Sequence, residues 1–202
     1  HKLGLDSTPT TDLPGAVAGQ LKNKELFINQ PIEPAVAAFG QGFSITPLKL
    51  AQLHALIANG GYFVHPHITK DFVHRDEDAF TDNDPLFSTE VTKTVLEWME
   101  TVVEKGSGKG VKTDRYRIGG KTGTADKSDG KNYKSKICSF VAILPIEDPR
   151  YVVVVAIDEP KKAYSYGSTV AVPVAKQIIE SLIVLEQIPP APDKTITLSL
   201  KD

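Results

Sequence analysis

The residues most able to do chemistry are Lys121, Thr122 and Thr124, which share one predicted strand over residues 116–125. Side chains on a strand alternate between its two faces, so the lysine lies on one face and both threonines lie on the other. Three glycines leave the backbone of this strand open to the close approach of a ligand; they are Gly119, Gly120 and Gly123. A cation, two hydroxyls and accessible backbone N–H groups together can bind a carboxylate or stabilise a developing oxyanion.

Two helices are predicted before this strand. The first begins at Thr46-Pro47, a good N-cap followed by a good first helical residue, and it ends at Asn59-Gly60-Gly61. The second begins after Ser88 and stops at Gly106, and Trp98 shares its apolar spacing, which predicts a core position for this side chain. The glycine-rich run 106–110 then leads to the strand, and we interpret it as a flexible connection near the site.

Two more strands and a long helix are predicted after a polar loop over residues 126–136. The strands cover 137–145 and 151–158, and the short turn between them favours antiparallel neighbours. The second of them is apolar at nearly every position, so both of its faces should be covered by helices. A helix from 168 to 187 supplies one cover, with Pro173 in its early part. We therefore predict an α+β fold in which helices cover an antiparallel sheet, over residues 1–188, with a proline-rich tail at 189–202.

Composition excludes several classes of function. The 202 residues carry a net charge of −2, which gives no reason to expect a nucleic-acid partner. No apolar run approaches the ~18–20 residues of a membrane span, and the N-terminus has no signal-peptide pattern. The single cysteine, Cys138, cannot form an intrachain disulfide and lies in an apolar strand pattern typical of a buried, inert thiol. His65 and His67 have metal-ligand spacing on a strand, but no third ligand is evident, so we expect neither a metal nor a cofactor.

The order of these features resembles the C-terminal part of the transpeptidase domain of class B penicillin-binding proteins, the division- or elongation-type enzymes of bacterial cell-wall synthesis. Two segments carry the resemblance: residues 40–52, which begin Gly-Gln-Gly-Phe-Ser, and residues 120–125, Gly-Lys-Thr-Gly-Thr-Ala. The match runs from Lys2 to about residue 187. The resemblance implies a five-stranded antiparallel sheet between helical layers, of which the three predicted strands are the last three.

The resemblance also implies roles for the residues of the motif strand. The hydroxyls of Thr122 and Thr124 would bind the terminal carboxylate of a peptide substrate or of a penicillin, with Gly123 between them. Lys121 would hold the local potential positive, and the backbone N–H of Thr124 would be one of two oxyanion donors. Because Lys121 and Thr122 point to opposite faces, both can serve one site only if this is an edge strand.

Beyond the motif strand, the resemblance places Tyr166-Gly167 after the last strand of the sheet, where Tyr166 would form part of an aromatic wall. Tyr133, in the predicted loop after the motif strand, would extend that wall. The implied activity is that of a serine D,D-transpeptidase, which cross-links D-Ala-D-Ala stem peptides of peptidoglycan and is acylated by β-lactams. The implied location is the extracytoplasmic, periplasmic face of the bacterial membrane, held by an N-terminal anchor, with other cell-wall or divisome proteins as partners.

The nucleophile that the family uses is not evident in this chain. It is the serine of a Ser-x-x-Lys motif, which together with Ser-x-Asn should precede Lys-Thr-Gly. One Ser-x-x-Lys string occurs, at 128–131, but it follows the motif strand in a turn, so we reject it; the loosely similar 81–83 is rejected too. We expect both motifs upstream of His1, in a missing N-terminal part of the same domain. This chain alone would then be inactive, and would bind that part, pair with a copy of itself or aggregate.

Two alternatives remain open from the sequence. A catalytically silent receptor or scaffold could carry the same fold, since the nucleophile is not in view. A serine β-lactamase or β-lactam sensor shares Lys-Thr-Gly, although the segment at 40–52 argues against it.

Overall fold

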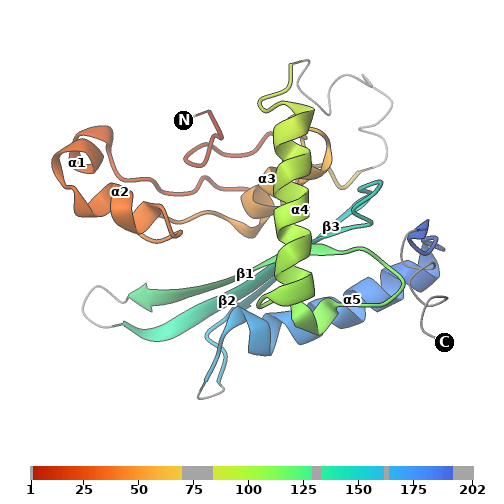
Figure 1. The fold of residues 1–202 in the computed structure, drawn as a ribbon. Coiled ribbons are helices and arrows are strands. Elements are labelled where there is room, and N and C mark those ends of the chain that lie inside the picture. The colour runs from red at the N-terminus through yellow and green to blue at the C-terminus, as the bar shows by residue number, and fades with distance from the viewer. Residues whose placement is uncertain (1, 70–83, 129–132, 162–163, 193–202) are drawn as a thin grey trace. The chain divides into compact units, whose positions relative to one another are not determined.

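The computed structural model describes residues 2–69, 84–128, 133–161 and 164–192. Contacts within the chain divide it into two compact units (Figure 1). The first comprises residues 1–56 and 62–86, and the second comprises residues 57–61 and 87–202. Residues 193–202 of the predicted proline-rich tail lie outside the described residues.

The first unit is built from short helices and extended segments. Helices α1 (Lys24–Asn29) and α2 (Ile32–Ala37) have six residues each. The third helix, α3 (Pro47–Ala58), begins where predicted, and Thr46 caps it by accepting a hydrogen bond from Lys49 N at 3.1 Å. Two residues with positive φ, Gly60 and Gly61, follow its end.

The second unit contains an antiparallel sheet in the order β1 (Gly119–Ser128), β2 (Tyr133–Leu144) and β3 (Tyr151–Asp158). The prediction of three antiparallel strands is confirmed. The predicted polar loop at 126–136 is wrong at both ends, because Asp126 pairs with Lys136 and Lys127 pairs with Ser135. Backbone hydrogen bonds hold this part of the ladder together, and they do not require apolar side chains on an exposed face.

Helices α4 (Thr89–Lys105) and α5 (Val172–Leu185) cover opposite faces of this sheet (Figure 1). Alternation along β2 directs Ile143 to the α4 side, where it packs with Leu96, Met99 and Ile146. The neighbouring side chains of β2 point to the α5 side. There they join the larger core cluster, which includes Phe140, Ala142, Leu144, Val153, Val155, Val172, Ala175 and Ile179.

The prediction that Trp98 belongs to the core is wrong, because 67% of its surface is exposed. The buried face of α4 is formed by Thr92, Leu96, Met99 and Val103, which recur at intervals of three and four residues. Trp98 precedes Met99 by one position and therefore points about 100° away around the helix. Apolar residues occupy more of α4 than one face can bury, so their spacing alone did not identify the buried stripe.

The predicted helix at 168–187 begins with a π-helical turn, η4 (Gly167–Ala171), and continues as α5 with Pro173 in its first turn. By length and composition, the segment Gly167–Leu185 would suffice to cross a membrane, contrary to the expectation above. Several of its residues are nevertheless buried against the sheet; they include Ala171, Val172, Ala175 and Ile179. Within the second unit, this segment covers the face of the sheet opposite to α4.

Arg117 joins α4 to the residues that lead into β1. Its Nε and Nη2 donate to the two carboxylate oxygens of Glu100 at 2.8 and 2.7 Å, and this bidentate ion pair is mostly shielded from water. We expect Glu100→Gln to lower the free energy of unfolding by about 1–3 kcal/mol, because it removes the negative charge from a charge-assisted pair. Urea denaturation measures this change. Glu97→Gln on the exposed face of α4 is the matched control, and an equal loss in both variants would contradict the prediction.

Candidate active site

Strand β1 lies at one edge of the described sheet, since only β2 pairs with it. The motif strand is therefore an edge strand of the described sheet, which is the condition under which Lys121 and Thr122 can serve one site. The beginning of the strand follows Arg117, which is bonded to Glu100. Its residues from Lys121 to Ala125 are partly or fully exposed, whereas the two glycines before them are buried.

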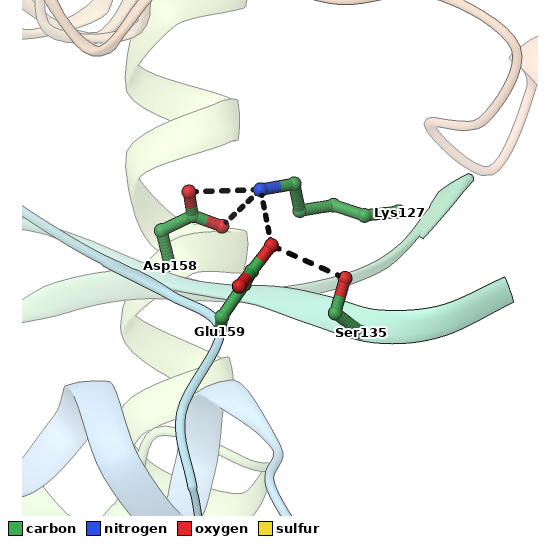
Figure 2. A network of polar contacts seen from close by, with 4 residues as sticks. All are labelled: Lys127, Ser135, Asp158 and Glu159. Atoms are coloured by element: carbon green, nitrogen blue, oxygen red, sulfur yellow. Dashed lines mark hydrogen bonds and ion pairs between the residues drawn. The ribbon is translucent and has the colours of Figure 1, made fainter. Parts of the chain in front are cut away.

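The far end of β1 is tied to the other two strands by the polar network in Figure 2. Lys127 Nζ lies 2.8 and 2.9 Å from the carboxylate oxygens of Asp158 and 3.0 Å from Glu159 Oε1, and Ser135 Oγ donates to the same Glu159 oxygen at 3.4 Å. The hydrogen bonds with the two carboxylates raise the pKa of Lys127. Because the pKa of Lys127 is raised, the contribution of its positive charge to stability is present at neutral pH and is lost as the pH rises through that raised pKa.

Gly119 and Gly120 do not leave room for a ligand, so this part of the prediction is wrong. A Cβ on Gly119 would lie 2.7 Å from Ile146 Cδ1, and one on Gly120 would lie 2.5 Å from Phe140 Cζ. Both glycines are needed because the core of the protein itself packs against the strand. Gly123 is only partly buried, and a Cβ there would lie 2.5 Å from Ser139 Oγ, the end of a side chain that can turn aside, so ligand access at Gly123 stays a prediction.

Thr124 and Gly167 lie together, although 43 positions separate them in the chain. The backbone N–H of Gly167 donates to Thr124 Oγ1 at 3.0 Å. A Cβ on Gly167 would lie 2.5 Å from Ser139 O and 2.7 Å from Gly123 O, so only glycine allows η4 to start this close to the sheet. The hydrogen bond occupies one lone pair of the Thr124 hydroxyl and leaves its proton available to a ligand.

Tyr166 stands next to this contact and is 47% exposed. The ammonium of Lys136, on β2, lies 4.9 Å from the centre of its ring, within the range of a cation–π contact. Thr169 Oγ1 accepts a hydrogen bond from the backbone N–H of Tyr166 at 3.0 Å, which holds the backbone at the start of η4. The side chain of Tyr133 lies outside the described part of the structure.

Thr122 is paired with a residue that the sequence pattern did not single out. The hydroxyls of Thr122 and Ser107 are 2.6 Å apart, and either can be the donor. Ser107 belongs to the glycine-rich run 106–110, so this run contacts the motif strand, while its place beside a functional site stays a prediction. The sequence feature that could have identified Ser107 is a single hydroxyl side chain between two glycines at the end of a predicted helix.

Lys121 is exposed, and its Nζ donates to the backbone carbonyl of Thr122 at 2.8 Å. Within the described ranges, no carboxylate forms an ion pair with it. Its charge is therefore free to interact with an anion that approaches the edge of β1. Lys121, Thr122 and Thr124 thus offer one positive charge and two hydroxyls with defined partners, a combination suited to a carboxylate ligand.

Other candidates from the sequence do not join this site. Ser128 is the last residue of β1, so it does not start a helix as a Ser-x-x-Lys nucleophile would, and the string at 81–83 lies outside the described residues. Cys138 is fully buried, as predicted, and its burial raises the pKa of the thiol. Among the described residues, no three His, Cys, Asp or Glu side chains are close enough together to hold a metal ion.

Comparison with known proteins assigns the chain to a family. The model of the penicillin-binding protein transpeptidase domain matches residues 1–180. The peptidoglycan D,D-transpeptidase FtsI homolog of Mesostigma viride is 41% identical over 95% of this chain and 36% of its own length. FtsI of Escherichia coli K12 is 32% identical over 94% of this chain and 31% of its own length. The chain thus spans about a third of the length of these relatives.

Solved structures agree with the sequence relatives. The transpeptidase domain of penicillin-binding protein 3 from Burkholderia pseudomallei superimposes with a TM-score of 0.81, at 31% identity, over 94% of this chain and 56% of that domain. Penicillin-binding protein 3 from Mycobacterium tuberculosis, solved with aztreonam, gives 0.78 at 28% identity, over 95% of this chain and 46% of that one. With its three antiparallel strands and its Lys-Thr-Gly motif on the edge strand, this chain belongs to the penicillin-binding protein transpeptidase family.

Proposed function

We propose that this chain forms one wall of the active site of a serine D,D-transpeptidase that cross-links peptidoglycan. The observation that carries the proposal is the edge strand β1, on which Lys121, Thr122 and Thr124 present a charge and two oriented hydroxyls. Membership of the transpeptidase family supplies the reaction class. The nucleophilic serine comes from a part of the protein outside this chain.

In the proposed reaction, the serine oxygen attacks the carbonyl carbon of the D-Ala-D-Ala peptide bond. The bond to the terminal D-Ala breaks, the amine leaves with a proton, and an ester joins the serine to the stem peptide. An amine of a neighbouring stem peptide then attacks this ester, forms the cross-link and restores the serine hydroxyl. A β-lactam acylates the same serine by opening its ring.

The residues of this chain act on the substrate without becoming covalently modified. The hydroxyls of Thr122 and Thr124 donate hydrogen bonds to the terminal carboxylate, and Lys121 stabilises the same negative charge. The backbone N–H of Thr124 faces the oxygen that becomes negative in the tetrahedral intermediate. Tyr166 lines the cleft beside Gly167, and Tyr133 extends this wall. No cofactor is required for this chemistry.

The proposed setting follows from the substrate. Peptidoglycan is assembled outside the cytoplasmic membrane, so the full-length protein acts on the extracytoplasmic face, held by an N-terminal anchor. Other cell-wall synthesis or divisome proteins are the proposed partners, together with the upstream part of the same domain, which completes the sheet beside β3.

Labelling with fluorescent penicillin tests the proposed function. The full-length protein should form a covalent adduct that survives denaturing electrophoresis, and unlabelled penicillin should compete for it. The isolated 202-residue chain should remain unlabelled, because it lacks the serine. Absence of labelling in the full-length protein would indicate the catalytically silent alternative. Rapid release of hydrolysed penicillin would indicate a β-lactamase instead.

A further inference from the structure

Ser107 contacts the motif strand from a separate element. Its Oγ lies 2.6 Å from Thr122 Oγ1, at the short end of the range for O–H···O hydrogen bonds. The two residues are 15 positions apart, so the contact depends on how the loop after α4 meets β1. Neither hydroxyl has another described hydrogen-bond partner, which leaves both free to take part in binding a ligand.

The loop that carries Ser107 is held by its own backbone. The N–H groups of Gly106 and Gly108 both donate to Val102 O, at 2.9 and 3.1 Å, on the last turn of α4. The following turn, η3 (Lys109–Val111), buries Val111 in the core cluster. Ser107 is thus fixed between two anchored glycines, and its hydroxyl meets Thr122 without ordering a mobile segment when a ligand binds.

The effect of this contact follows from the number of hydrogen bonds that each hydroxyl can donate and accept. A hydroxyl has one proton to donate and two lone pairs that accept. When Ser107 donates to Thr122, the proton of Thr122 remains free for an incoming carboxylate. Thr124 is arranged in the same way, since it accepts from Gly167 N and keeps its own proton. With Ser107 as the donor, each threonine hydroxyl accepts one hydrogen bond from the protein and keeps its own proton for the ligand.

We propose that Ser107 is a positioning residue, which orients the hydroxyl of Thr122 toward the carboxylate of the ligand; this inference rests on the proposed function. The chain of two hydroxyls ending on an anion is polarised along its length, because each hydrogen bond strengthens the next. Ser107 thereby favours ligands that carry a carboxylate over otherwise identical ligands that do not.

The test compares benzylpenicillin with its methyl ester in the full-length protein. The ratio of the two acylation efficiencies measures how much the carboxylate contributes. We expect Ser107→Ala to reduce this ratio about fivefold, the effect of one net hydrogen bond, mainly through weaker initial binding rather than a slower maximal acylation rate. Ser107→Thr, which keeps a hydroxyl, should retain the wild-type ratio, and so should the control Ser181→Ala on the exposed side of α5.

Each other outcome overturns the inference. If Ser107→Ala slows the acid and the ester by the same factor, its role is structural and not directed at the carboxylate. A wild-type ratio in Ser107→Ala, or a reduced ratio in Ser107→Thr, would show that the hydroxyl does not orient Thr122. If the wild-type protein is not acylated by either compound, the proposed function itself fails, and the role of Ser107 fails with it.

Discussion

Lys121→Ala in the full-length protein is expected to slow acylation by penicillin by roughly 10²–10³-fold, the usual effect of removing one preorganised electrostatic partner from an acyl-transfer site. The lysine is exposed, and among the described residues its Nζ donates to the backbone carbonyl of the next residue, at 2.8 Å. Its removal therefore takes away a positive charge and leaves β1 in place.

Stopped-flow measurement of the acylation rate with a chromogenic cephalosporin tests this expectation, and circular dichroism confirms that the variant is folded. Lys93→Ala, which removes an exposed lysine from α4, is the matched control and should react at the wild-type rate. If Lys121→Ala acylates at the wild-type rate as well, Lys121 does not belong to the site.

Gly167→Ala has the second largest expected effect, because the added methyl group has no room. It would lie 2.5 Å from Ser139 O and 2.7 Å from Gly123 O, and backbone oxygens within a paired strand cannot rotate away. The start of η4 must then move outward, which breaks the hydrogen bond from Gly167 N to Thr124 Oγ1. We expect a loss of about 1–3 kcal/mol in stability from overpacking.

The same displacement should slow acylation by about ten- to a hundredfold, since Thr124 loses its fixed donor and Tyr166 moves with η4. Thermal unfolding and penicillin acylation are measured on the same preparation. Ser168→Ala, at the exposed neighbouring position, is the control and should change neither. A Gly167→Ala protein with normal stability and normal acylation would mean that η4 does not position the motif strand.

The strands and helices of the second unit could be predicted because their signals are local. Apolar β-branched runs at 137–145 and 151–158 indicated β2 and β3, and capping residues marked both ends of α4. The signals failed where burial depends on the partner surface. Trp98 and Met99 are both apolar and adjacent in sequence, and only the sheet beneath α4 decides that Met99 is the buried one.

The candidate site shows the same difference between local signals and contacts that depend on the fold. Lys121, Thr122 and Thr124 are adjacent in the chain, so their types and spacing were readable at once. The partners of the two threonines are 15 and 43 positions away, and no spacing rule connects them. Gly119 and Gly120 were assigned to ligand access, whereas Ile146 and Phe140 occupy the space beside them. Such contacts between distant segments follow only from the fold.

The exposed position of Trp98 has an experimental use, because it is the only tryptophan among the 202 residues. Indole emission depends on the polarity around the ring, so excitation at 295 nm reports on a single place, the outer surface of α4. A segment or partner that covers this helix would shift the emission to shorter wavelength, while a ligand bound at the edge of β1 would leave it unchanged. The chain thus carries a built-in optical probe that requires no labelling.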